Sequence, residues 1–148
     1  MEENLGSLLS QVSRLLRRNF DERTRGVGVT RPQWQVLSLL RMHAGSHQGA
    51  LAEMLEVEPI TLGRMIDRLQ DAGMVERRAD PTDRRAWRIY LTEKGDEQVE
   101  KLVPFGRETL DAALEGVPAA ERDQLMATLS TLRNNLSRRV QAELASNG

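Results

Sequence analysis

The stretch Glu58–Thr92, EPITLGRMIDRLQDAGMVERRADPTDRRAWRIYLT, decides the fold predicted for this chain. In its first half, apolar residues recur three and four positions apart, which is the period of an amphipathic helix. Pro59 suits the first turn of that helix, and Gly73 suits the position just after its end. The second half predicts two short strands, Met74–Arg78 and Trp87–Leu91, joined by the polar turn ADPTDRRA. A helix followed by a charged β-hairpin is therefore expected.

The helix that begins at Pro59 is expected to have one apolar and one polar face. Its inward positions are Leu62, Met65, Ile66 and Leu69. Thr61, Arg64 and Arg68 follow the i, i+3, i+7 spacing of the opposite face. A short helix, His47–Leu55, precedes it across a tight connection, which is the spacing of a helix-turn-helix.

This outward face has side chains that suit the major groove of DNA. Thr61 can donate to a phosphate or meet a thymine methyl, and Arg64 can form two hydrogen bonds to guanine. Arg68, one turn further on, is better placed for a backbone phosphate. A solvated charged face without DNA contact is the alternative for the helix taken alone.

The turn of the hairpin has Asp83, Arg84 and Arg85 at its tip. We expect Asp83 to brace the side chain of Arg85, two residues later, so that the guanidinium reaches the narrow minor groove. The alternative is an ordinary polar turn with a surface ion pair, which contributes little. Next to the helix, the hairpin favours DNA binding by a winged helix-turn-helix.

The remaining sequence predicts further helices on both sides of this region. They are Leu5 to about Arg25, Thr30 to Gly45, Thr92 to about Glu115, and Ala119 to about Leu144. Thr30 and Gln33 have capping-box spacing. The fold class is therefore mainly α with a small β component (α+β). Residues 1–148 are expected to form a single domain, with a winged-helix lobe at 30–91 and dimerisation helices at 1–28 and 92–148.

Composition excludes several classes of protein. The chain has 148 residues, of which 39% are hydrophobic and 29% charged, so a folded globular domain is expected. Its net charge is -1, but arginines concentrate between Arg64 and Arg88. The absence of cysteine excludes disulfides and thiol-based sensing. The acidic start MEENLGSLL lacks a signal peptide and no run is long enough for a membrane, which predicts a cytoplasmic protein. No catalytic pair or phosphate loop stands out, so no enzyme and no cofactor is predicted.

The last helix has an apolar stripe that predicts pairing with a second copy. The stripe consists of Leu125, Leu129, Leu132, Leu136 and Val140. Together with the Leu-rich first helix, it is more apolar surface than the edge of one small domain covers. A homodimer around a two-fold axis is the simplest explanation. Packing against the preceding helix of the same chain is the alternative.

At these residues the sequence resembles the MarR family of bacterial transcription regulators. The matching motifs are Asp80-Pro81-x-Asp83-Arg84-Arg85, Leu91-Thr92-Glu93-Lys94-Gly95, and Asp67-Arg68-Leu69 through Ala72-Gly73-Met74-Val75. The order of helices and hairpin also matches, and the wing motif and Trp34 are most similar to the SlyA-type branch. The resemblance implies an obligate homodimer on palindromic double-stranded DNA, and repression relieved by a small aromatic or phenolic ligand.

The resemblance also implies where such an effector binds, between the dimerisation helices and the DNA-binding lobe. Trp34 would supply an aromatic wall there, while Arg14 and Arg17 would meet the carboxylate of a small aromatic acid. The alternative is that Trp34 belongs to the core and both arginines lie on the surface.

Two other functions remain open from the residues alone. A winged helix can serve as a protein–protein adaptor without binding DNA. His43 and His47 are four residues apart, as in a metal-sensing regulator, but Gly45 interrupts the helix between them. We therefore expect no metal site, and helix-end or surface roles for both histidines.

Overall fold

The computed structural model describes residues 2–146 of the chain, except for the side chains of residues 140, 141 and 144. It is mainly helical with one small antiparallel sheet, as predicted. The chain divides between Thr109 and Leu110 into two compact units, which are described separately. Within residues 2–146, no helix combines the length and the hydropathy that a bilayer crossing needs.

The first two helices begin at the caps that their sequences favour. Helix α1 (Leu5–Thr24) is capped by Asn4, and helix α2 (Arg31–Met42) by Thr30. The Thr30 hydroxyl accepts from the backbone amide of Gln33 at 3.3 Å, and the Gln33 side chain accepts from the amide of Thr30 at 3.2 Å. This confirms the predicted capping box, in which two amides without helical partners are satisfied reciprocally.

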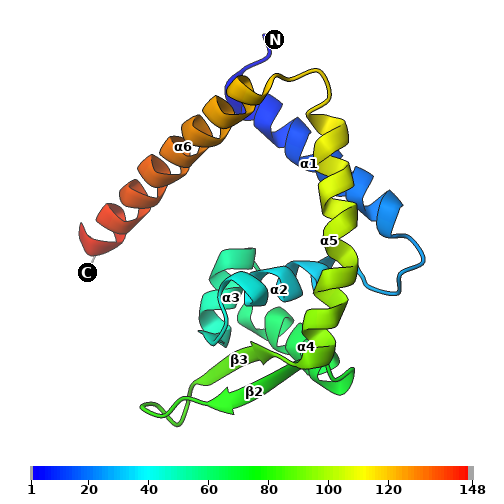
Figure 1. Cartoon of the computed structure of the whole chain (residues 1–148). Helices are drawn as coiled ribbons and strands as arrows, with labels where there is room; N and C mark the ends of the chain where they lie inside the picture. Colours follow the sequence, from blue (N-terminus) through cyan, green and yellow to red (C-terminus); the bar gives the residue numbers. More distant parts are fainter. Residues whose placement is uncertain (1, 147–148) are drawn as a thin grey trace. The chain divides into compact units, whose positions relative to one another are not determined.

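Helices α3 (Gln48–Leu55) and α4 (Pro59–Asp71) follow, and then the hairpin strands β2 (Val75–Ala79) and β3 (Trp87–Leu91). A two-residue strand β1 (Ser46–His47) completes the sheet in the order β1-β3-β2. The sequence had predicted a helix from His47, but His47 pairs with Arg88 of β3 and the helix begins one residue later. Figure 1 shows α2, α3 and α4 gathered beside the hairpin, whose loop projects away from the helices.

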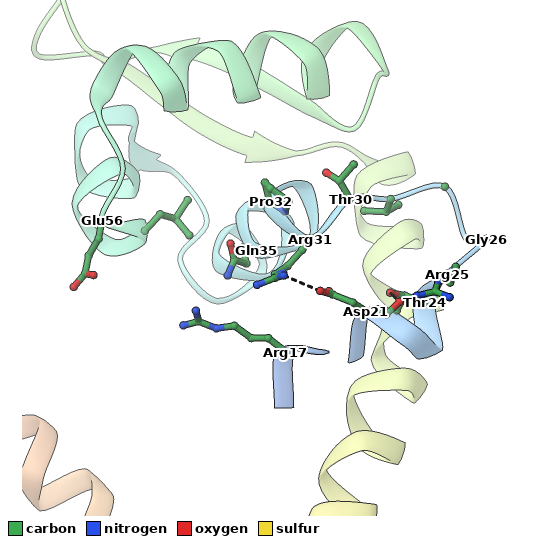
Figure 2. Close-up of a pocket in the computed structure, with 13 residues that line it drawn as sticks. Arg17, Asp21, Thr24, Arg25, Gly26, Thr30, Arg31, Pro32, Gln35 and Glu56 are labelled. Atoms are coloured by element: carbon green, nitrogen blue, oxygen red, sulfur yellow. Dashed lines mark hydrogen bonds and ion pairs between the residues drawn. The ribbon is translucent and has the colours of Figure 1, made fainter. Parts of the chain in front are cut away.

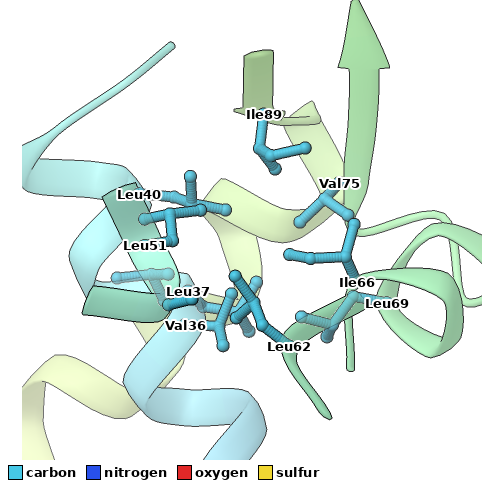
Figure 3. Packing of buried hydrophobic residues seen from close by; sticks show 11 residues of the cluster. Val36, Leu37, Leu40, Leu51, Leu62, Ile66, Leu69, Val75 and Ile89 are labelled. Carbon is cyan, nitrogen blue, oxygen red and sulfur yellow. The ribbon is translucent and has the colours of Figure 1, made fainter. Parts of the chain in front are cut away.

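The core of the first unit lies between these helices and the sheet, as Figure 3 shows. Its buried side chains are Val36, Leu37, Leu40, Leu51, Ala52, Leu62, Ile66, Leu69, Val75, Ile89 and Val99. The alternation predicted for β3 is confirmed at Ile89, which is fully buried, but Trp87 is 48% exposed. Trp87 pairs with Ala79 at the outer end of the hairpin, where the core no longer covers the strand.

Helix α5 (Glu93–Ala113) is joined to the hairpin by the motif Leu91-Thr92-Glu93-Lys94-Gly95. The amide of Thr92 donates to the carbonyl of Met74 at 3.0 Å, and its hydroxyl accepts from the amide of Gly95 at 3.1 Å. Gly95 is buried so closely that an added Cβ would lie 2.0 Å from the Met74 oxygen. The glycine therefore allows the first turn of α5 to pack directly on the chain that enters β2.

The second unit contains the end of α5 and helix α6 (Ala119–Ser146). Gly116 adopts φ +81° at the bend, and Arg122 donates to the carbonyls of Leu114 and Val117, at 2.8 Å each. Of the predicted stripe on α6, Leu125 and Leu136 are 46% and 64% exposed, and Leu129 and Leu132 are half-buried. The side chain of Val140 lies outside the described residues.

Candidate nucleic-acid interface

Helix α4 is held by its apolar side and presents its polar side to solvent. Leu62, Ile66 and Leu69 are buried in the core. Thr61, Arg64 and Arg68 are exposed, as the spacing predicted. The turn before α4 includes Glu56 at φ 54° and ψ 43°, a left-handed conformation that is uncommon for residues other than glycine. This sharp turn separates α3 from α4 and gives the pair the form of a helix-turn-helix.

The hairpin loop carries its charged residues at the tip. Asp83, Arg84 and Arg85 are all exposed. The Asp83 carboxylate accepts from the backbone amide of Arg85 at 3.0 Å, and within residues 2–146 it forms no ion pair with the Arg85 guanidinium. Asp83 thus orients the main chain of Arg85 rather than bracing its side chain as expected, which is the usual geometry of an Asx turn.

The residue that organises the loop is Asp80, which begins the wing motif but for whose side chain the sequence predicted no role. Its side chain is only 2% exposed. One carboxylate oxygen accepts from the Thr82 amide and hydroxyl at 2.8 and 2.7 Å and from the Asp83 amide at 3.2 Å. The other meets His47 Nε2 at 2.5 Å and Arg88 Nε at 2.8 Å. Asp80 therefore ties the loop to both β1 and β3.

These contacts stabilise the charged form of Asp80. The hydrogen bond from His47, followed by those from Thr82 and from Arg88, holds the pKa of the Asp80 carboxyl well below its usual range. Because His47 is also the N-cap residue of α3, the network joins the hairpin loop to the first helix of the helix-turn-helix. The motif Asp80-Pro81-x-Asp83 signalled a turn, but nothing local in the sequence identified His47 as a partner.

Other arginines of the hairpin are engaged within the protein. Arg78 lies over the ring of Tyr90, 4.1 Å from its centroid, and pairs with Glu76. Arg77 turns to the helices, where it pairs with Asp67 of α4 at 2.7 Å. The exposed arginines of α4 and of the loop are therefore the ones placed to meet a polyanion.

No cluster of three or more His, Asp or Glu suited to a metal ion occurs within the described residues.

A pocket of about 920 Å³ lies in the first unit, between the end of α1 and the start of α2 (Figure 2). It is lined by Arg17, Asp21, Thr24, Arg25, Gly26, Gly28, Val29, Thr30, Arg31, Pro32, Gln35, Leu55 and Glu56. Arg31 pairs across it with Asp21 at 2.9 Å.

The structure does not bring the three predicted effector residues together in this pocket. Of the three, Arg17 lines the pocket, whereas Arg14 and Trp34 do not. Trp34 instead stacks on Phe20, with ring centroids 5.3 Å apart and an angle of 26° between the planes. It also packs against the core. The pocket's own apolar surface comes from Val29, Pro32 and Leu55.

Comparison with known proteins connects this geometry to one family. The model of the MarR family matches residues 29–87, which include both helices of the helix-turn-helix and most of the hairpin. Wild-type MarR from E. coli in its apo form is 28% identical, with a TM-score of 0.78 over 89% of this chain and 98% of that one.

Two further solved structures concern binding to DNA or its regulation by a small molecule. A mutant MarR from E. coli in complex with operator DNA is 29% identical, with a TM-score of 0.73 over 86% of this chain and 92% of that one. BpsR from Bordetella bronchiseptica, whose structure concerns regulation of its DNA binding by 6-hydroxynicotinic acid, is 25% identical. Its TM-score is 0.75 over 88% of this chain and 99% of that one.

Proposed function

We propose that this chain, which belongs to the MarR family of DNA-binding transcriptional regulators, represses transcription as a homodimer on a palindromic operator. In the same proposal, a small aromatic acid releases it. One observation carries the proposal: a helix face with exposed Thr61, Arg64 and Arg68 lies beside a hairpin whose exposed tip has two further arginines. Residues 30–91 would form the DNA-binding lobe.

Each exposed side chain has a distinct role in this proposal. Arg64 reads a guanine in the major groove, and Thr61 meets a thymine methyl or a phosphate. Arg68 binds a phosphate and fixes the register. Arg84 and Arg85 extend from the hairpin into the adjacent minor groove, where a narrow groove concentrates negative potential. Asp83 supports this arrangement through its hydrogen bond to the Arg85 amide.

The proposed dimer is supported by apolar side chains that each unit exposes by itself. On α1, Leu5, Leu8 and Leu15 are 58%, 45% and 52% exposed. On α6, Met126 and Leu136 are 66% and 64% exposed. Pairing around a two-fold axis would remove such surface from water. It would also present two copies of α4 to major-groove faces about 34 Å apart, as a palindromic site requires.

The proposed effector site is the pocket between α1 and α2. The guanidinium of Arg17 and that of Arg31 would meet a carboxylate, and Pro32 and Leu55 would pack on an aromatic ring. The 6-hydroxynicotinic acid of BpsR is an aromatic carboxylate of this kind. Arg14 and Trp34 do not line this pocket, and Trp34 serves in the proposal as a fluorescent reporter on α2, the helix that carries the lining residues Arg31 and Pro32. A ligand that prefers a different helix spacing lowers DNA affinity by that preference, typically ~1–3 kcal/mol.

The DNA-reading part of the proposal is tested in two steps. A duplex that the wild-type chain binds is first selected from a library of randomised duplexes, and the affinities of the variants for this selected duplex and for random DNA are then measured. Arg64→Ala should cost roughly 1–3 kcal/mol on the selected duplex and less on random DNA. Arg107→Ala, an exposed arginine of α5, serves as the matched control and should change neither value. Equal losses on both DNAs would mean that Arg64 touches phosphate only. Failure of the wild-type chain to bind any duplex at low salt would favour the adaptor instead.

Fluorescence of Trp34 in a Trp87→Phe background tests the effector part, with salicylate and 6-hydroxynicotinic acid as probes. Both acids should change the emission and bind more weakly when the selected duplex is present, because linkage between two sites is reciprocal. Arg17→Ala should weaken the binding of both acids. Equal acid affinity with and without DNA, or no binding at all, would contradict release by an aromatic acid.

A further inference from the structure

Arg77 of strand β2 extends its guanidinium toward the helix-turn-helix, and its side chain is only 19% exposed. Nε donates to the Gln48 side chain of α3 at 3.2 Å, and Nη1 donates to the Gln70 side chain of α4 at 2.9 Å. Nη2 donates to the Gly63 carbonyl at 3.3 Å and pairs with the Asp67 carboxylate at 2.7 Å. One side chain of the hairpin thus contacts both helices through all three of its nitrogens.

The partners of Arg77 on α4 define one side of that helix. Gly63, Asp67 and Gln70 are spaced i, i+4, i+7, so they lie in a row along about two turns. Arg64 and Arg68 each follow a member of this row by one residue, a rotation of about 100° around the helix axis. The contacts of Arg77 therefore set the direction in which Arg64 and Arg68 point.

We propose that Arg77 is a positioning residue for DNA reading: it fixes the rotation of α4 relative to the hairpin. The arginines of α4 and those of the hairpin tip then face the same DNA. A planar guanidinium suits this role because its N–H groups diverge in one plane toward several acceptors, whereas an ammonium is a compact point charge. This inference rests on the DNA reading by α4 proposed above.

Arg77 also neutralises a charge that would oppose DNA. Asp67 is 62% exposed on α4, one residue before Arg68. Left unpaired, its carboxylate would repel a phosphate that Arg68 approaches. Gly63 contributes to the same arrangement, since an added Cβ there would lie 3.3 Å from Gln48 Nε2 and crowd the side chain that Arg77 contacts.

The test compares Arg77→Gln and Arg77→Lys with the wild-type chain on the selected duplex and on random DNA, at several salt concentrations. Both variants should lose about tenfold or more in affinity for the selected duplex, with a smaller loss on random DNA. In an Arg68→Ala background, where the phosphate contact that Arg77 positions is already absent, Arg77→Gln should leave the slope of affinity against salt unchanged, because Arg77 itself touches no phosphate. A slope reduced by about one further unit in that background would make Arg77 a direct phosphate contact and overturn the proposal. Full function of Arg77→Lys would also overturn it, because charge alone would then suffice.

A double-mutant cycle with Arg64→Ala separates positioning from general stability. If Arg77 acts through Arg64, Arg77→Gln should cost much less affinity in the Arg64→Ala background than in the wild type. Additive losses would overturn the proposal. If Arg77→Gln does not fold, Gln70→Ala takes the place of Arg77→Gln in the cycle, because it removes one of the acceptors that Arg77 contacts. The affinities of the wild-type chain and of the single variant Arg64→Ala test the proposed function without any change at Arg77. A failure of the proposed function is therefore distinguishable from a failure of this inference.

Discussion

Replacing Gly95 by alanine tests the packing between α5 and the hairpin most directly. The new Cβ would lie 2.0 Å from the carbonyl oxygen of Met74 and 3.2 Å from Leu91 Cδ2. A backbone oxygen cannot rotate away as the end of a side chain can, so either α5 or the chain before β2 must move by about 1 Å. The same oxygen accepts the hydrogen bond from the Thr92 amide at 3.0 Å, so the movement strains that bond as well.

The expected cost follows from these contacts. Overpacking of this kind costs about 1–3 kcal/mol, and loss of one backbone hydrogen bond about 0.5–1.5 kcal/mol. Alanine is favoured over glycine within a helix by about 1 kcal/mol, which offsets part of the cost. The free energy of unfolding of Gly95→Ala should therefore fall by about 1–3 kcal/mol, a large share of the roughly 5–15 kcal/mol typical of a folded protein.

Urea unfolding at one fixed protein concentration measures this change. Gly49→Ala in α3 is the matched control, because nothing lies within 4 Å of a Cβ added there. The control should gain about 0.5–1 kcal/mol from helix propensity alone. If Gly95→Ala is as stable as the wild-type chain, the close approach of α5 to Met74 does not constrain the fold.

Three further results are expected. The wild-type chain should be more stable than Asp80→Asn at neutral pH, and the difference between their free energies of unfolding should shrink below about pH 4. Because the folded protein lowers the pKa of Asp80, its ionised carboxylate stabilises the fold at pH values above the ordinary carboxyl pKa, and this stabilisation is lost as the pH falls toward the pKa of the folded state. A difference independent of pH would contradict this. Arg85→Ala should lower the salt slope of DNA binding by about one unit, and Asp83→Ala should weaken binding more mildly; unchanged affinity in both would exclude the hairpin. Leu136→Glu should shift the sedimentation coefficient toward that of a monomer, whereas Ser137→Glu should not.

Local sequence signals predicted most of the fold. The Thr30–Gln33 capping box and Pro59 at the start of α4 depend on residues only a few positions apart, and both are confirmed. The period-two pattern of β3 is confirmed at Ile89 but not at Trp87, which is exposed. The exposed face with Arg64 and Arg68 followed from the same periodicity. Propensity and spacing suffice where a structure is stabilised by its immediate neighbours in the chain.

The features that the sequence did not predict depend on distant partners. Strand β1 has two residues and no strand pattern of its own; it exists because Ser46 pairs with Ile89. The buried carboxylate of Asp80 was missed for the same reason, since its partner His47 is 33 positions away. The stacking of Trp34 on Phe20 likewise joins two helices whose relative placement no local pattern specifies.

The pairing of β1 with β3 has a consequence for the order of folding. Strands β2 and β3 are joined by a short loop, so they can pair as a β-hairpin within microseconds. Joining β1 brings together segments such as Gly45 and Arg88, which are 43 positions apart, and closing so long a loop costs chain entropy. We expect β1 to join the sheet after α3 and α4 have docked. Weakening its pairing should then mainly accelerate unfolding and leave the folding rate nearly unchanged.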